Sequence, residues 1–462
     1  MKHTLCYIYK IILMSLYISE VSTLMKILTT TINTLIAFCA INMYSLPVIR
    51  EHTYLVAILA VGFVLINIFP SFYNRKMPTL RLRVCGDGCE LLIIFLISTF
   101  LSTIFFIFKM HLGLTSSWIV GLLVAIVMES IIFWNGIIRV YITSLQLAIK
   151  WRLIGILCGW IPIVHLFVLC KIIHIALKET AFESAKILTN NERQKNYICR
   201  TKYPLLLVHG VFFRDSKYLN YWGRIPAELE KNGAIIYYGN QQSAASVADC
   251  GKEISERISQ IVQETGCKKV NIIAHSKGGL DCRYAISKFG ADKWVASVTT
   301  INTPHRGCLF AEYLLSKIPE NSRNFIAHKY NLTLKKLGDN NPDFLAAVND
   351  LTVSSCKKRN ETIVDVPSVF YQSVGSKLNK ATSGKFPLNF SYHLVKHFDG
   401  LNDGLVSIDS FAWGEISTLL TVSGSRGISH GDMIDLNRDN IDEFDVREFY
   451  VNLVHNLKDR GF

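Results

Sequence analysis

The feature that most constrains this chain is a series of long apolar stretches within its first 180 residues. Each approaches the roughly 20 apolar residues that a helix needs to cross a bilayer. A cleavable signal peptide has one short apolar stretch and does not account for the series. We therefore predict an all-helical membrane region over residues 1–180, with about five transmembrane helices at Ile27 to Met43, Thr53 to Phe72, Leu91 to Phe108, Trp118 to Ile138 and Leu153 to Ala176.

Two interpretations of the N-terminus are possible, and they give different numbers of spans. The stretch Thr4 to Ile18 is also apolar, although Lys10 interrupts it, and could be a sixth span. Met25 could instead be an alternative translation start. The sequence does not decide between these readings.

The charge of the chain favours a membrane over nucleic acid as its partner. The formal net charge is +13, yet the sequence has no recognisable nucleic-acid-binding motif. Its Lys and Arg residues are scattered or flank the apolar stretches, as contact with anionic lipid headgroups requires. We expect a membrane partner and no nucleic acid; the oligomeric state stays unknown.

Lys and Arg residues also give a prediction of orientation, because cytoplasmic loops are enriched in them. The loops after the first and third spans carry only Arg50 and Lys109. The other side carries Lys2, Lys10, Lys26, Arg75, Lys76, Arg81, Arg83, Arg139, Lys150 and Arg152. Five spans then predict an integral protein of the cell membrane with its C-terminal part on the extracellular side. A sixth span would place the C-terminal part on the cytoplasmic side. Lys171, Lys178 and Lys186, near the last span, argue weakly against the extracellular placement.

The remainder of the chain has the composition of a globular domain. Residues 181–202 are polar and read as a linker. After them, short apolar runs alternate with amphipathic segments, which predicts an α/β domain over residues 203–462 with a doubly wound, mostly parallel sheet. The expected strands are 203–208, 234–238, 270–274 and 294–301, and the expected helices are 225–231, 247–264 and 280–289.

Ser276 lies in the turn between the strand 270–274 and the helix 280–289. A strand, a sharp turn and a helix form the nucleophile elbow of serine hydrolases, in which the residues two before and two after the serine must be small. Ala274 and Gly278 meet that condition. Since Ala replaces the usual first Gly, the short motif by itself is also compatible with an ordinary turn.

A serine nucleophile needs a base and an orienting acid, which in this fold follow in the order acid, then His. His430 is the best-placed base, because it ends a Gly-rich loop that leaves the strand 419–422; the other candidates are His305, His328, His393, His397 and His455. The candidates for the acid are Asp399, Asp403 and Asp409. We choose Asp403 because it lies in the tight turn Asn402–Gly404. The backbone N–H groups of Val211 and Lys277 are the predicted oxyanion donors.

Several separated motifs now point to one family. They are Leu207-Val208-His209-Gly210, Tyr221-Trp222-Gly223, Ala274-His275-Ser276-Lys277-Gly278-Gly279-Leu280, Asn302-Thr303-Pro304-His305-Arg306-Gly307 and Asn402-Asp403-Gly404. With them, residues 203–462 resemble the bacterial triacylglycerol lipases of the α/β-hydrolase fold. The resemblance implies Ser276 as nucleophile, Asp403 as acid and His430 as base. It also implies a structural calcium at Asp432, two residues after His430, although the family's other calcium-binding Asp has no match, so a solvated Asp432 is the alternative.

The expected function is that of a membrane-anchored serine hydrolase, a triacylglycerol lipase or carboxylesterase, that cleaves carboxylic esters of lipids through an acyl-enzyme. Its chemistry requires no cofactor. The amphipathic helical stretch 306–355 is a predicted lid or cap, with core packing as the alternative. Two other functions stay open: an acyltransferase or phospholipase with the same triad, and a transporter or sensor with a hydrolase-like ligand-binding domain. Glu129, inside the fourth span, is either a transport site or a hydrogen-bonded carboxyl.

Overall fold

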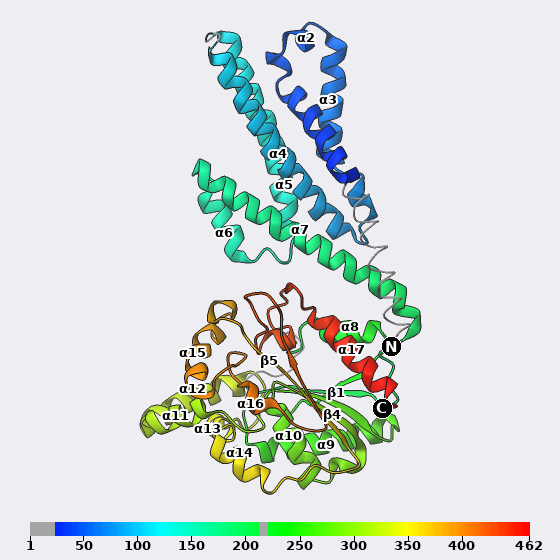
Figure 1. Cartoon of the computed structure of the whole chain (residues 1–462), viewed down its shortest axis with the longest axis vertical. Coiled ribbons are helices and arrows are strands. Elements are labelled where there is room, and N and C mark those ends of the chain that lie inside the picture. Colours follow the sequence, from blue (N-terminus) through cyan, green and yellow to red (C-terminus); the bar gives the residue numbers. More distant parts are fainter. Residues whose placement is uncertain (1–23, 112, 114, 212–219) are drawn as a thin grey trace. The chain divides into compact units, whose positions relative to one another are not determined.

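The computed structural model describes residues 24–111, 113, 115–211 and 220–462. The chain divides into two compact units, Met1–Thr189 and Asn190–Phe462 (Figure 1). The first unit is helical. Its helices are α2 (Pro47–Arg50), α3 (Thr53–Ile68), α4 (Leu80–His111), α5 (Ser116–Thr143), α6 (Ile149–Cys158) and α7 (Pro162–Arg193).

Four helices within the described residues are long and apolar enough to cross a membrane: Leu24–Ile41, Thr53–Lys76, Leu80–His111 and Ser116–Thr143. They correspond to the first four predicted spans. Large apolar side chains along them face outward, such as those of Ile58, Phe100 and Val127. An outward apolar surface is what lipid contact requires.

The fifth predicted span, 153–176, is not one membrane-length helix. The chain bends between the end of α6 at Cys158 and the start of α7 at Pro162. Proline lacks the N–H that would continue the first helix and is well suited to begin the second. α7 then passes through the expected linker 181–202 as far as Arg193, so most of that polar segment is helical.

α4 is longer than its apolar core predicts, since it begins at Leu80 and includes two buried acids, Asp87 and Glu90. The amide of Asn74 donates to Asp87 at 2.9 Å, and the Thr30 hydroxyl donates to Glu90. Acidic residues in a sequence window count against predicting a membrane helix there, because a carboxylate is costly inside the bilayer. Polar partners from neighbouring segments satisfy these two here.

Glu129 is buried and accepts a hydrogen bond from the neighbouring helix α4. Ser98 donates to one carboxylate oxygen at 3.0 Å. The side chain borders a cavity of about 500 Å³ whose other lining residues are mostly apolar. Its other carboxylate oxygen is buried without a hydrogen-bond partner among the described residues, so the transport site and the hydrogen-bonded carboxyl both stay predictions.

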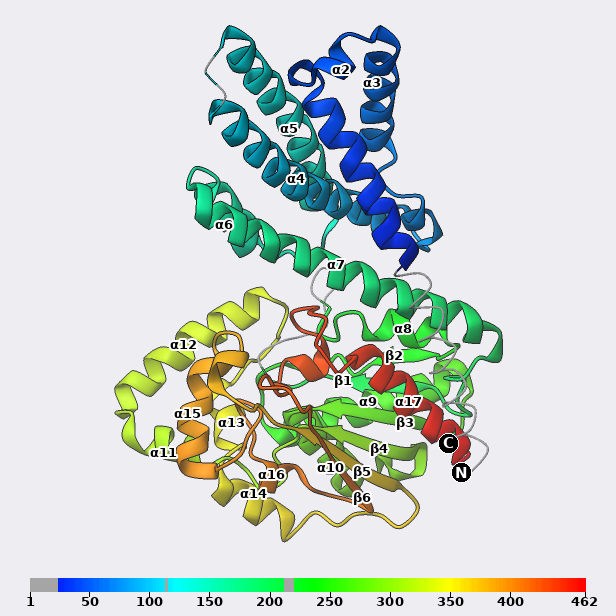
Figure 2. The ribbon, with the colours of Figure 1, turned by 45° about the horizontal axis from the view of Figure 1, so that its top comes forward.

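The second unit is built on a six-stranded sheet in the order β2-β1-β3-β4-β5-β6, with every neighbouring pair parallel (Figure 2). The strands are β1 (Leu205–Val208), β2 (Ile236–Tyr238), β3 (Val270–His275), β4 (Val295–Ile301), β5 (Phe370–Ser376) and β6 (Ile416–Leu420). β1, β3 and β4 are buried along their whole length, as the continuous apolar runs predict.

Helices cover both faces of this sheet. On one face α8 (Ile225–Lys231) and α17 (Val446–Asp459) pack around Trp222 and Tyr450. On the other face lie α9 (Val247–Thr265) and α10 (Lys277–Lys288), which bury Ile254, Ile258 and Cys282 against the strands. The expected doubly wound α/β architecture is therefore confirmed, with all carboxyl ends of the strands at one edge.

The stretch between β4 and β5 is helical, in the region of the expected lid. It contains α11 (Leu309–Lys317), α12 (Glu320–Lys336), α13 (Phe344–Asn349) and α14 (Val353–Asn360). After β5 come α15 (Leu388–Asp399) and α16 (Ile408–Phe411). Opening or closing of this region over the site stays a prediction.

α4 and α5 approach closely at two glycines, which generates a prediction. A Cβ atom on Gly136 would lie 2.9 Å from Leu92 and 3.1 Å from the carbonyl oxygen of Gly88. Gly136→Ile should therefore force the helices apart and destabilise the first unit by about 1–3 kcal/mol. Thermal unfolding of the detergent-solubilised protein should show a lower midpoint. Val127→Ile, on an outward position of α5, is the control that should leave the midpoint unchanged.

Candidate active site

Ser276 lies at the carboxyl end of β3 in a conformation that few residues other than glycine adopt, with φ 55° and ψ −132°. Such backbone strain persists only where the surroundings enforce it. Here the Ser276 N–H donates to the carbonyl of Ile301 at 2.9 Å, and the Thr303 hydroxyl donates to the Ser276 carbonyl at 2.8 Å. The turn is thus held from β4, and Ser276 lines a cavity at this edge of the sheet.

Close packing explains why the flanking residues must be small. A Cβ atom on Gly278 would lie 2.4 Å from the carbonyl oxygen of His209, and one on Gly210 would lie 2.8 Å from the Cβ of Ser276. Both distances are far inside van der Waals contact. The loop after β1 therefore rests directly on the turn that presents Ser276.

His430 and Asp403 form a buried pair. The Nδ1 of His430 lies 2.7 Å from the Oδ2 of Asp403, and the His430 N–H donates to the Asp403 carbonyl at 2.9 Å. Asp403 accepts at its other oxygen from the N–H groups of Leu405 and Val406, at 2.8 and 2.7 Å. Because a carboxylate accepts the Nδ1–H, the Nε2 of His430 is left as the basic nitrogen.

Asn302 is a residue of this site that sequence reasoning did not single out. Its side-chain amide donates to Asp403 Oδ2 at 2.6 Å and to Ser376 at 2.8 Å. Asn302 directly follows β4, so its position at the carboxyl edge of a parallel sheet was a usable signal. With it, four donors surround the Asp403 carboxylate.

Ser276 and His430 border the same cavity, which has a volume of about 580 Å³. Val211 lines it too, and Lys277 begins α10, where backbone N–H groups have no acceptor within the helix. The structure therefore brings all four of these residues to one place. Roles as nucleophile, base and oxyanion donors stay predictions.

The Lys277 side chain has a separate, structural partner. Its ammonium is buried and lies 2.7 Å from Asp281, one turn further along α10. Burial by itself would lower the pKa of Lys277, but Asp281 raises it above the ordinary value. The ion pair therefore persists and fixes the first turn of the helix that follows Ser276.

Tyr221 is a second site residue whose role only the structure reveals. Its hydroxyl accepts from the Gly210 N–H at 2.9 Å and lies 2.7 Å from Nδ1 of His275. Burial lowers the pKa of His275 well below the ordinary value, so its ring is neutral and Nδ1 accepts a hydrogen bond from the Tyr221 hydroxyl. The His275 ring in turn lies 4.4 Å from that of His430. His275 therefore links the loop after β1, through Tyr221, to His430, and these contacts agree with the expected structural role.

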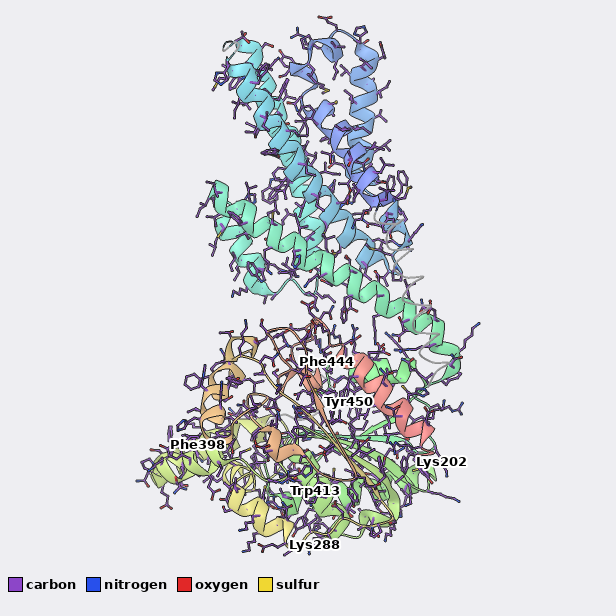
Figure 3. The ribbon with its side chains drawn as sticks, in the orientation of Figure 1. Lys202, Lys288, Phe398, Trp413, Phe444 and Tyr450 are labelled. Carbon is purple, nitrogen blue, oxygen red and sulfur yellow. The ribbon has the colours of Figure 1, made fainter. Side chains whose placement is uncertain are left out.

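The other histidine candidates lie outside the cavity lining. His305 is fully buried against Trp413, a residue labelled in Figure 3, with ring centroids 5.2 Å apart. Burial lowers its pKa well below the ordinary value. The Thr300 hydroxyl lies 3.0 Å from its Nε2. His305 therefore packs at the end of β4, away from the lining of the cavity.

Asp432 does not fit a calcium site. Arg426 binds both of its carboxylate oxygens, at 2.7 and 3.1 Å, and the Ser429 N–H donates to it at 2.8 Å. No group of three or more His, Cys, Asp or Glu residues that could hold a metal ion occurs in the described part of the chain. A guanidinium thus occupies the position of the expected metal ion.

Comparison with known proteins identifies the family. The family model "Putative serine esterase (DUF676)" matches residues 206–365. A triacylglycerol lipase of Pseudarthrobacter phenanthrenivorans is 32% identical over 243 residues, which cover 50% of this chain and 71% of that protein. This chain belongs to the triacylglycerol lipase family. The resemblance read from the sequence motifs is confirmed, and with it the hydrolysis of ester bonds as the type of reaction.

Other triacylglycerol lipases also match about half of the chain. The enzyme of Burkholderia plantarii is also 32% identical, over 50% of this chain and 63% of its own length. Among solved structures, a lipase of Bacillus licheniformis in its mature form covers 55% of this chain and 92% of that one, at 24% identity and a TM-score of 0.41.

Buried neutral histidines make the stability of the second unit depend on pH. When the pH is below 6.5, the ordinary pKa of histidine, His275 is protonated in the unfolded chain but stays neutral in the folded protein. Stability should therefore fall on acidification by about 1.4 kcal/mol per pH unit for each such residue. His305 adds a second contribution.

His275→Asn keeps an acceptor for Tyr221 but has no titrating ring. Urea unfolding of the full chain, compared at about pH 5 and about pH 7, should show a smaller loss of stability in this variant than in the wild type. An equal loss in both proteins would contradict the assignment of a neutral, buried His275.

Proposed function

We propose that this chain is a membrane-anchored lipid esterase that works through a Ser276–His430–Asp403 triad. The observation that carries the proposal is a single cavity bordered by a strained Ser276 and by His430, whose Nδ1 is held by Asp403 at 2.7 Å. Apolar residues from α11, α12 and α13 form much of the wall, among them Leu315, Ile326 and Phe344. Such a wall accommodates an acyl chain.

In the proposed mechanism, Nε2 of His430 takes the proton of the Ser276 hydroxyl as the oxygen attacks the ester carbonyl. Asp403 holds the imidazole in the required tautomer and stabilises the cation that forms. The N–H groups of Val211 and Lys277 bind the developing oxyanion, each worth about 3 kcal/mol. His430 then protonates the leaving alcohol, and water, activated by the same base, releases the fatty acid.

The triad is tested by Ser276→Ala in the full chain. Hydrolysis of glycerides by membrane fractions should fall by at least about 10³-fold, since the nucleophile is lost. Ser259→Ala, on α9 and outside the cavity, is the matched control and should retain full activity. Undiminished hydrolysis by Ser276→Ala would refute the proposal. Product analysis in the presence of an alcohol distinguishes hydrolysis from acyl transfer.

Asn302 should act as a positioning residue for the acid. Asn302→Ala removes a charge-assisted hydrogen bond to Asp403, so kcat should fall by roughly 10–100-fold while KM stays nearly constant. Gln372→Ala provides a comparison: this residue donates to Thr299 at 2.8 Å in the same sheet but does not contact the acid. A rise in KM at constant kcat would instead place Asn302 in substrate binding.

Orientation in the membrane follows from the number of spans. With the four spans of the described residues, the stretches that carry Arg75 to Arg83 and Arg139 to Arg152 fall on one side, and Arg50 and Lys109 on the other. The possible span Thr4 to Ile18 lies outside the described residues, and it would not change which of these loops share a side. We therefore propose that the catalytic unit lies on the cytoplasmic side, where Lys171, Lys178 and Lys186 also agree with the charge rule. The extracellular placement rested on a fifth span that the described residues do not contain.

Protease protection tests this orientation. In intact cells an added protease should leave residues 190–462 whole, and after lysis it should cleave them, as detected with an antibody to the C-terminus. A short epitope inserted between α4 and α5 is the control, because four spans place that loop outside. Cleavage of the catalytic unit in intact cells would restore the extracellular placement.

A further inference from the structure

The wall of the catalytic cavity contains one charged side chain whose function is unexplained. Among the described residues that line the cavity, only Arg323 and Lys385 carry a permanent charge. Lys385 is already paired, since its ammonium lies 2.6 Å from Asp439. Arg323, in the first turn of α12, has no ion pair within the described part of the chain.

Arg323 is half-buried, and its Nε–H is fully buried without a hydrogen-bond acceptor among the described residues. A buried donor on a cation that lacks an acceptor is costly. The guanidinium geometry, with several donors in one plane, matches the oxygens of a carboxylate or a phosphate.

The charge around the cavity also favours an anion. α12 carries four basic residues, Arg323, Lys329, Lys335 and Lys336, against the single acid Glu320. No Asp or Glu occurs among the described lining residues. An anionic group that enters the cavity therefore meets a positive potential and no opposing carboxylate.

We propose that Arg323 binds the phosphate of a glycerophospholipid whose acyl ester lies at Ser276. The inference rests on the proposed function and names its substrate class. The phosphate is the anionic group that every glycerophospholipid carries into the cavity while its ester is still intact. A fatty acid acquires its carboxylate only at Ser276 and would not hold Arg323 during the reaction. Hydrolysis adds water across the acyl ester and yields a lysophospholipid and a fatty acid.

Arg323→Met keeps much of the side-chain volume and removes the charge. We expect kcat/KM of the full-length protein for phosphatidylglycerol to fall by about tenfold or more, the loss of one charged hydrogen bond. The value for diacylglycerol with the same acyl chains should change less than about twofold. Both substrates are presented at trace level in the same non-ionic detergent micelles, so that the surface charge of the micelle is constant.

Lys329→Met is the matched control, because it removes a charge from an exposed position of the same helix that does not line the cavity. It should leave the ratio of the two substrates unchanged, and Arg323→Lys should retain part of the preference. Equal losses for both lipids in Arg323→Met, or a change confined to inhibition by added oleate, would overturn the inference. Wild-type protein that hydrolyses neither lipid would instead refute the proposed function.

Discussion

The catalytic unit depends on the close contact between the loop after β1 and the turn after β3. The His209 carbonyl lies where any side chain at position 278 would have to be, and Gly210 lies against Ser276 itself. This contact forces Ser276 into its strained conformation and points its side chain into the cavity. It also brings Val211 beside the serine, so one packing constraint positions the proposed nucleophile and a proposed oxyanion donor together.

A second layer of hydrogen bonds makes that arrangement rigid. Tyr221 links the Gly210 N–H to His275, and the His275 ring packs against that of His430. Asp403 is satisfied by His430, Asn302 and two backbone N–H groups. Because every acceptor oxygen of the acid is occupied, the pair does not need to reorganise when charge develops during the reaction.

Local sequence patterns were sufficient for much of this unit. The apolar runs at 205–208, 270–274 and 295–301 are β-strands because parallel strands are buried on both faces and need no polar alternation. The elbow could be predicted from Ala274 and Gly278, since only small residues tolerate the contacts there. Patterns were less reliable for helices near the membrane: α4 includes Asp87 and Glu90, and the window 153–176 is divided before Pro162. Hydrogen-bond partners that are distant in sequence, such as Thr30 for Glu90, determine whether an acidic residue is tolerated inside such a helix.

The sequence by itself determined the family, the order of strands and helices, and the residue types that a serine hydrolase needs, because these depend on local periodicity and short motifs. Only the tertiary structure decided that Asn302 and Tyr221 support the site, that Arg426 pairs with Asp432, and that Arg323 lines the cavity without an ion pair among the described residues. These residues are far apart in the chain. Their roles arise from hydrogen bonds and charges that exist only once the sheet has brought its carboxyl edge together.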